Sequence, residues 1–377
     1  MLSNARLLID SLRFWPVPDA GALAERWSRA DAQAIVRLAA REGAALWLHR
    51  RLRALGVILP AECTDLLSVA ARRSAAQSLK VDEEVVAAFS ILDAAGIRAV
   101  PLKAAVMRRI TNRVPFADAR ATADVDLLVS QDCAERAWKA FVDRGYSARR
   151  AAPKDGHHLA GLFGALGVAV ELHTSTSAAI LPAEAWKRAT CDGAVAHFNG
   201  HVRGVPGDTE LLWHAASHAM AHMDDAGRAL RLRGWLDAAA LLAGEVVIDW
   251  DRINARLDSA ECAHPHVLRA WFRVASDLSG RPLPAGALGN VSGKPIELER
   301  LLSWRLRVSA RFPGGGRWAE KLAEEGARGE VRMGLQPAHD GDGVVARARH
   351  AVACGAARGW WLVRRQDFPF TGVVFSR

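Results

Sequence analysis

Two short segments limit what the middle of this 377-residue chain can fold into: DVDLLV, which begins at Asp124, and VAVELHT, which begins at Val168. Alternation of apolar and polar residues with a period of two is typical of β-strands. Side chains two residues apart lie on the same face of a strand. Asp124 and Asp126 therefore share a face of the first strand, and Glu171 and His173 share a face of the second. If the two strands are neighbours, three carboxylates meet on the sheet.

Helical patterns separate these strands. Residues 96–100 (GIRAV) predict a further strand, residues 101–112 (PLKAAVMRRITN) predict a helix, and residues 130–145 predict a helix that ends at Gly145. Strand, helix, strand, helix, strand in this order is typical of a compact α/β unit.

Helices are predicted on both sides of this unit. Upstream, residues 30–56 predict one helix that ends at Gly56, and residues 78–96 predict a helix that ends at Gly96. Downstream, apolar residues recur at helical spacing in four segments: 208–223, 231–244, 261–280 and 295–311.

A chain of this length can form more than one hydrophobic core. We predict an α+β fold in which a small mixed β-sheet core is flanked by N-terminal and C-terminal helical regions. The predicted division in chain order is an N-terminal helical region (1–92), an α/β core (93–181), a C-terminal helical region (182–325), and a linker with a basic, tryptophan-containing tail (326–377).

Composition says more about where the protein is located than about what it does. The formal net charge is +9, but the bases are mostly arginine in an alanine-rich chain, which indicates a compositional habit rather than a specific partner. The five cysteines form no CxxC pair, and no apolar run reaches the length of a membrane helix. We therefore predict a cytoplasmic protein without a transmembrane segment.

The aspartate pair predicts a metal site. Two carboxylates on one face of a strand repel each other unless a cation lies between them, and hard oxygen ligands suit Mg²⁺, or Mn²⁺ in its place. A D-x-D pair is common, however, and on its own it also fits a capping or solvated feature at a strand edge.

The order of the motifs is more specific than any one of them. VPLKAA (100–105), RATADVDLLV (120–129) and VELHT (170–174) follow one another along the chain. In this order they resemble the core of an uncharacterised bacterial nucleotidyltransferase family within the polymerase-β-type nucleotidyltransferase superfamily. The resemblance covers residues from about 10 to about 325, including the helices on both sides.

The resemblance implies roles for the acidic residues and two basic ones. Asp124 and Asp126 would hold metal ions, and Glu171 would be the third ligand or the general base. Lys103 would contact the triphosphate of a nucleotide. Arg120 would bind a phosphate or pair with the aspartates. For both basic residues a surface ion pair is the alternative.

The chain departs from the family pattern at one position. Where the family has glycine after the lysine, this chain has Ala104. Glycine lets backbone amides approach a phosphate closely, so the alanine raises the question of altered nucleotide binding more than of altered metal binding.

Histidines form a second group of candidates. His214, His218 and His222 recur every four residues, on one stripe of a helix. We expect His214 and His218 to line an acceptor site together with Asp237; the alternatives are packed or surface histidines and a zinc site. His173 would orient Glu171, contact the nucleotide, or only pack.

The function implied by the resemblance is Mg²⁺-dependent transfer of a nucleotidyl or related phosphate-linked group. The donor would be an NTP or another activated nucleotide, and the acceptor a hydroxyl or phosphate on a small molecule such as a sugar, on a modified peptide or on a protein. Two alternatives stay open: a nucleotidyltransferase that acts on tRNA or other RNA, which the scattered basic residues do not favour, and a binding protein that keeps the fold.

Overall fold

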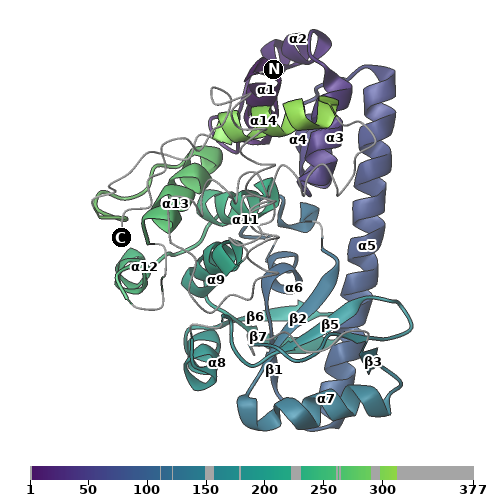
Figure 1. The fold of residues 1–377 in the computed structure, drawn as a ribbon, viewed down its shortest axis with the longest axis vertical. Helices are drawn as coiled ribbons and strands as arrows, with labels where there is room; N and C mark the ends of the chain where they lie inside the picture. Colours follow the sequence, from purple (N-terminus) through teal and green to yellow (C-terminus); the bar gives the residue numbers. More distant parts are fainter. Residues whose placement is uncertain are drawn as a thin grey trace, which may run out of the picture.

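The computed structural model describes residues 2–110, 112–120, 122–148, 157–177, 180–221, 231–259, 262, 265–289 and 298–311. The predicted linker and basic tail at 326–377 lie outside these residues. The described part is an α+β protein in which a small mixed sheet is surrounded by helices, as predicted (Figure 1).

The N-terminal region is helical. Its elements are α1 (Leu2–Leu12), α2 (Ala20–Ser28), α3 (Ala32–Arg41), α4 (Ala45–Ala54) and α5 (Ala61–Ala94). Helix α5 is 34 residues long and runs along one side of the molecule (Figure 1). The helix predicted at 78–96 is the C-terminal half of α5, and Gly96 follows it with a φ of 64°, a conformation that favours glycine.

The prediction of one helix over residues 30–56 was wrong. The chain breaks at Gly43, which has a φ of 71°, and continues as two helices, α3 and α4. A Cβ atom at Gly43 would lie 3.2 Å from Cδ of Arg233. The backbone turn therefore favours glycine, and a side chain here would also crowd a neighbour from a distant part of the chain.

The main sheet has the strand order β1-β2-β5-β4-β3. The strands are β1 (Ala99–Pro101), β2 (Asp124–Val129), β3 (Ser147–Ala148), β4 (Leu162–Phe163) and β5 (Ala169–His173). Strand β2 pairs antiparallel with β1 and parallel with β5, so the two strands predicted to carry the acids are neighbours.

The two faces of β2 have different surroundings. Val125, Leu127 and Val129 are buried in the main core, on the face that α5 and α7 (Ala134–Asp143) cover. On the opposite face, Leu128 packs with Ala189 of α8 (Pro182–Cys191). Asp124 and Asp126 share that second face, at the start of the strand, so the predicted alternation is confirmed.

A hairpin was not predicted from the sequence. Strands β6 (Ala194–Phe198) and β7 (His201–Val205) form a two-stranded antiparallel sheet within a region that was expected to be helical. Asn199 and Gly200 join them with φ values of 42° and 93°, as a tight hairpin turn requires. The Asn-Gly pair between alternating residues is the signal that could have revealed this hairpin.

Six further helices follow in the described residues, and the last of them packs against the N-terminal region. They are α6 (Lys103–Met107), α9 (Asp208–Ala221), α11 (Leu232–Ala243), α12 (Trp250–Leu257), α13 (Pro265–Ser279) and α14 (Leu298–Arg311). Helix α14 packs against α1 and α3, although about 260 residues separate them in the chain (Figure 1). Glu42 joins these parts, because its carboxylate accepts a hydrogen bond from the backbone N–H of Leu232 (3.0 Å) and pairs with Arg305 (2.5 Å).

Across the described residues, every helix is too short or too polar to cross a membrane.

Candidate active site

Strands β2 and β5 bring the predicted acids together. The parallel pairing places Asp126 directly beside Glu171, and Leu128 directly beside His173. Asp126 is 2% exposed, whereas the side chain of Glu171 is 28% exposed. The site therefore has a buried acid at its base and a more accessible acid next to it.

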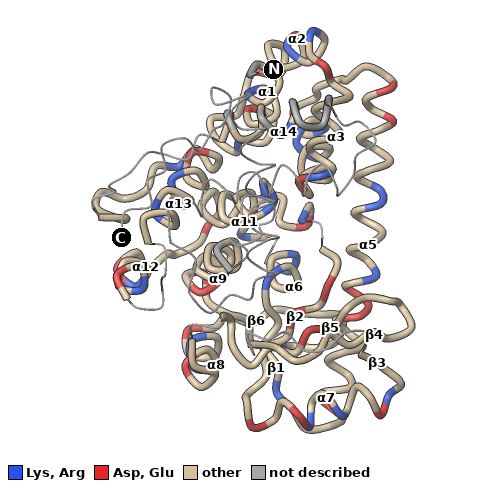
Figure 2. Tube along the Cα trace, in the orientation of Figure 1, with Lys and Arg blue, Asp and Glu red and all other residues tan. Residues whose placement is uncertain are grey.

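Asp126 is the centre of the polar contacts. Its Oδ1 atom accepts hydrogen bonds from Nζ of Lys103 (2.6 Å) and from Nε2 of His173 (2.9 Å). Acidic positions on β2 and β5 thus lie close to basic positions around α6 (Figure 2). A buried carboxylate needs this compensation, because an unpaired charge away from water is very costly.

The two aspartates have opposite pKa shifts. Burial alone would raise the pKa of Asp126, but Lys103 and His173 outweigh it and hold that pKa well below its usual range. The charge of Asp126 in turn raises the pKa of Asp124, and burial adds to this effect. Within the described residues the Asp124 carboxylate makes no hydrogen bond or ion pair, so negative charge at this end of β2 is not fully compensated.

His173 bridges two of the acids. Its Nε2 atom also lies 3.7 Å from Oε2 of Glu171. Burial lowers the pKa of His173, but the contacts with Asp126 and Glu171 more than offset this and raise it overall. Through the same contact, His173 lowers the pKa of Glu171. The imidazole of His173 therefore lies between two carboxylates, and its Nδ1 atom is buried and without a hydrogen-bond partner in the described structure.

Lys103 reaches Asp126 from a strained backbone position. Its φ is 49°, in the left-handed region that non-glycine residues rarely occupy and that costs on the order of 1 kcal/mol. Ala104 follows within α6 at an ordinary φ and is buried. The left-handed backbone conformation is therefore that of Lys103. Ala104, which stands where the family has glycine, has a backbone conformation that does not require glycine.

The donor set fits a divalent cation. Ligand atoms of Asp126, Glu171 and His173 lie within 4.8 Å of one another, and this is the one such group of three among the described residues. Asp124 lies outside that group but interacts electrostatically with Asp126 and Glu171. Carboxylate oxygens suit Mg²⁺ or Mn²⁺, and the uncompensated charge at Asp124 is the feature that a cation would relieve.

Arg120 and Asp237 form a separate buried pair next to this group. Nε of Arg120 donates to Oδ2 of Asp237 at 2.7 Å, and both side chains are buried. Arg120 thus pairs with an aspartate of α11 rather than with those of β2, although its charge still lowers the pKa of Asp124 in part.

Of the predicted histidine stripe, His214 and His218 lie on α9, with ring centroids 6.3 Å apart, whereas His222 lies outside the described residues. His214 is buried, and burial together with the charges of Lys103 and His173 lowers its pKa to about 3. His214 is therefore a neutral imidazole near enough to Lys103, His173 and Asp126 to interact with them electrostatically.

The low pKa of His214 predicts a pH dependence of stability. Between its ordinary pKa of 6.5 and about 3 the unfolded chain binds a proton that the folded chain does not, so stability falls as pH decreases through this range. From about pH 6 to about pH 4.5 this one residue contributes a loss of about 2 kcal/mol. We expect His214→Gln to lose correspondingly less than the wild type over that interval in urea unfolding.

The control for this prediction is His197→Gln, because His197 is exposed on β6. It should reproduce the pH dependence of the wild type. Equal pH dependence in the wild type and in His214→Gln would show that His214 is not buried as a neutral group.

The sequence alone indicated no role for three other residues near the site. The rings of His157 and His158 lie 5.7 and 5.1 Å from the ring of His173. Arg233 lies on α11, one turn before Asp237, and interacts electrostatically with Arg120, Asp237 and Asp124. Arg233 is part of the LRGWLD segment, but helical spacing does not show which charges it approaches.

Comparison with known proteins gives one match. A family model described as uncharacterised nucleotidyltransferase matches residues 28–275. No curated protein and no solved structure matches the chain. The matched range includes the strands β1, β2 and β5, the helices α6, α9 and α11, and all the site residues described above.

Proposed function

We propose that this chain, which belongs to the family of uncharacterised nucleotidyltransferases, transfers a nucleotidyl group from an NTP. The proposed reaction depends on Mg²⁺ and takes place at Asp124, Asp126 and Glu171. Nucleotidyl transfer is the activity class of the family. The donor, the ion and the acceptor are our proposals.

One observation carries this proposal: the parallel register that sets Asp126 beside Glu171 on adjacent strands. Together with Asp124, two residues earlier on β2, it provides oxygen ligands from two strands at one place. The compensation of Asp126 by Lys103 and His173 keeps that carboxylate ionised, as a metal ligand must be.

In the proposed reaction an oxygen of the acceptor forms a bond to the α-phosphorus of the NTP. The bond from that phosphorus to the oxygen bridging the α- and β-phosphates breaks, and pyrophosphate leaves. The bound ion would neutralise charge on the phosphates and orient the reacting oxygens. When the acceptor is a hydroxyl, Glu171, the more exposed acid, is placed to take its proton if it does not itself serve as a ligand.

Other residues have supporting roles in this proposal. Lys103, which is bonded to Asp126, would offer a positive charge to phosphate oxygens, and Arg120, which is bonded to Asp237 of α11, would offer a second one. His173 orients Asp126 and Glu171, since it contacts both. His214 and His218, together with Asp237, would border the acceptor, which we propose to be a small molecule, a peptide or a protein that carries a hydroxyl or a phosphate.

Metal removal and label position test the reaction. We expect protein incubated with an NTP labelled at the α-phosphate, Mg²⁺ and candidate acceptors to transfer label for at least one of the four NTPs. Excess EDTA should abolish the transfer, and added Mg²⁺ or Mn²⁺ should restore it. The matched control is the same NTP labelled at the γ-phosphate, whose label should leave with pyrophosphate.

The alternative outcomes separate the competing functions. Nucleotide binding that needs Mg²⁺ but leads to no transfer with any acceptor would favour a binding protein. Transfer only to RNA, with binding weakened strongly by salt, would favour the RNA-modifying alternative. Label transfer from the γ-phosphate would contradict nucleotidyl transfer.

A further inference from the structure

The cations around the acidic site are not equivalent. Lys103 is hydrogen-bonded to Asp126, and Arg120 is hydrogen-bonded to Asp237. The guanidinium of Arg233 makes no hydrogen bond or ion pair with any described residue. It is the cation at this site whose hydrogen-bonding capacity is not used.

Helix geometry and packing direct Arg233 towards the site. Residues four apart lie on the same face of a helix, so Arg233 shares a face of α11 with Asp237, which holds Arg120. Its Cδ would lie 3.2 Å from a Cβ atom at Gly43, so the aliphatic part of the side chain packs against the turn between α3 and α4. The side chain is half-buried, and its pKa is lowered by burial and by the neighbouring Arg120.

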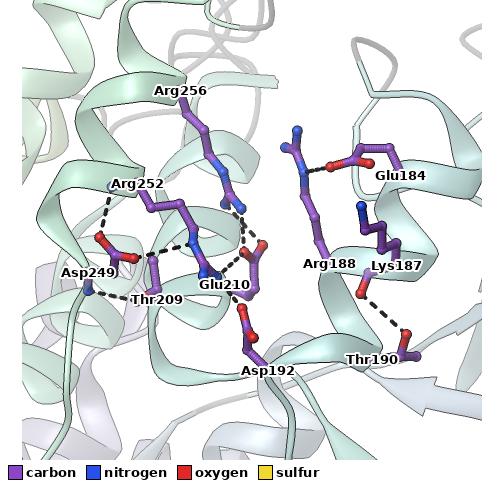
Figure 3. Close-up of polar contacts among 10 residues, drawn as sticks. All are labelled: Glu184, Lys187, Arg188, Thr190, Asp192, Thr209, Glu210, Asp249, Arg252 and Arg256. Atoms are coloured by element: carbon purple, nitrogen blue, oxygen red, sulfur yellow. Dashed lines mark hydrogen bonds and ion pairs between the residues drawn. The ribbon is translucent and has the colours of Figure 1, made fainter.

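Comparable arginines elsewhere in the protein have partners. Arg256 of α12 donates to both oxygens of Glu210, at 3.0 Å for Nη1 to Oε2, and Arg252 contacts the same carboxylate (Figure 3). Arg305 of α14 pairs with Glu42. A carboxylate thus neutralises each of these arginines, whereas the buried Arg51 donates to the backbone carbonyl of Arg13.

Arg233 does not bond even to the nearest unpaired carboxylate oxygen on its own helix. Oδ1 of Asp237 is buried and has no hydrogen-bond partner in the described structure, yet Arg233, one turn away, does not donate to it. Two guanidinium groups, Arg120 and Arg233, therefore lie close together while only one is paired. A half-buried cation beside another cation is unfavourable unless an anion binds there.

We propose that Arg233 binds phosphate oxygens of the nucleotide, with Arg120 beside it, and so fixes the polyphosphate relative to Asp124. This inference rests on the proposed function. The planar guanidinium suits phosphate because it can donate two parallel hydrogen bonds, which a lysine cannot. Arg233 is a binding and positioning residue in this proposal, and it takes no part in proton transfer.

The test measures equilibrium binding of NTP with Mg²⁺, and of pyrophosphate, by calorimetry. We expect Arg233→Ala to raise the Kd for both about 10- to 100-fold, which is the usual effect of losing hydrogen bonds to a charged group. The Kd values of Arg233→Lys should lie between those of the wild type and those of Arg233→Ala, because lysine keeps the charge but cannot donate two parallel hydrogen bonds. The thermal unfolding midpoint of Arg233→Lys, measured in parallel, should change little, because lysine keeps the aliphatic packing and the guanidinium has no hydrogen bond or ion pair to lose among the described residues.

The matched control is Arg231→Ala, which removes the same charge from an exposed residue two positions earlier. It should bind both ligands as the wild type does. Binding by Arg233→Ala that equals the wild type overturns the inference about Arg233 and leaves the proposed function intact. Wild-type protein that binds neither NTP nor pyrophosphate overturns both.

Discussion

Asp126→Asn is expected to lower the rate of nucleotidyl transfer by about 10²- to 10³-fold, which is the effect of losing a preorganised electrostatic group in an active site. The substitution removes the charge that binds a cation, and it also changes the contacts of Lys103 and His173, which both donate to the same Oδ1 atom. The measurement is transfer of α-phosphate label under saturating Mg²⁺, with folding checked by circular dichroism.

The control for this prediction is Asp132→Asn, because Asp132 is exposed just beyond the end of β2. Its activity should match the wild type. Activity of Asp126→Asn within tenfold of the wild type, in a folded protein, would mean that the reaction does not depend on the carboxylate at the centre of the site.

The second large effect concerns stability. Removing one partner of a buried ion pair leaves an uncompensated charge, so we expect Asp237→Ala to lower the free energy of unfolding by about 3–5 kcal/mol. Arg120, its partner at 2.7 Å, is buried and has only Asp237 as a hydrogen-bonded carboxylate in the described structure. The midpoint of urea unfolding measures the change.

Two comparison variants test whether the unpaired charge of Arg120 causes the loss of stability. The double variant Arg120→Met/Asp237→Leu should be more stable than Asp237→Ala, because it leaves no charge without a partner. Asp143→Ala breaks the exposed pair of Lys139 and Asp143, whose side chains are 72% and 59% exposed, and should have no measurable effect. A double variant as unstable as Asp237→Ala would show that packing, not the unpaired charge, determines the loss.

The sequence predicted best what depends on local periodicity. Alternation at Asp124–Val129 and around Glu171 predicted both strands and the faces of their acids, and the structure confirms these faces. The meeting of the three acids depended on β2 and β5 being neighbours, which the local pattern could not show. The structure shows that the two strands pair in parallel. The division of the chain into four regions stays a prediction.

Features that depend on distant contacts were not predictable in the same way. The break at Gly43 is coupled to Arg233, which lies about 190 residues later. The bond between Lys103 and Asp126 spans 23 residues, and that between Arg120 and Asp237 spans 117. The resemblance to the family identified Lys103 and Arg120 as candidates, but only the fold shows that both are bonded to carboxylates, whereas the Arg233 guanidinium is bonded to none in the described structure.

The most direct measurement is an anomalous diffraction map of crystals grown with Mn²⁺ and an NTP analogue that cannot be cleaved between the α- and β-phosphates. We predict an anomalous peak within bonding distance of carboxylate oxygens from both Asp126 and Glu171, at about 2.0–2.3 Å. A bound analogue whose metal ion contacts neither carboxylate, or lies away from β2 and β5, would contradict it.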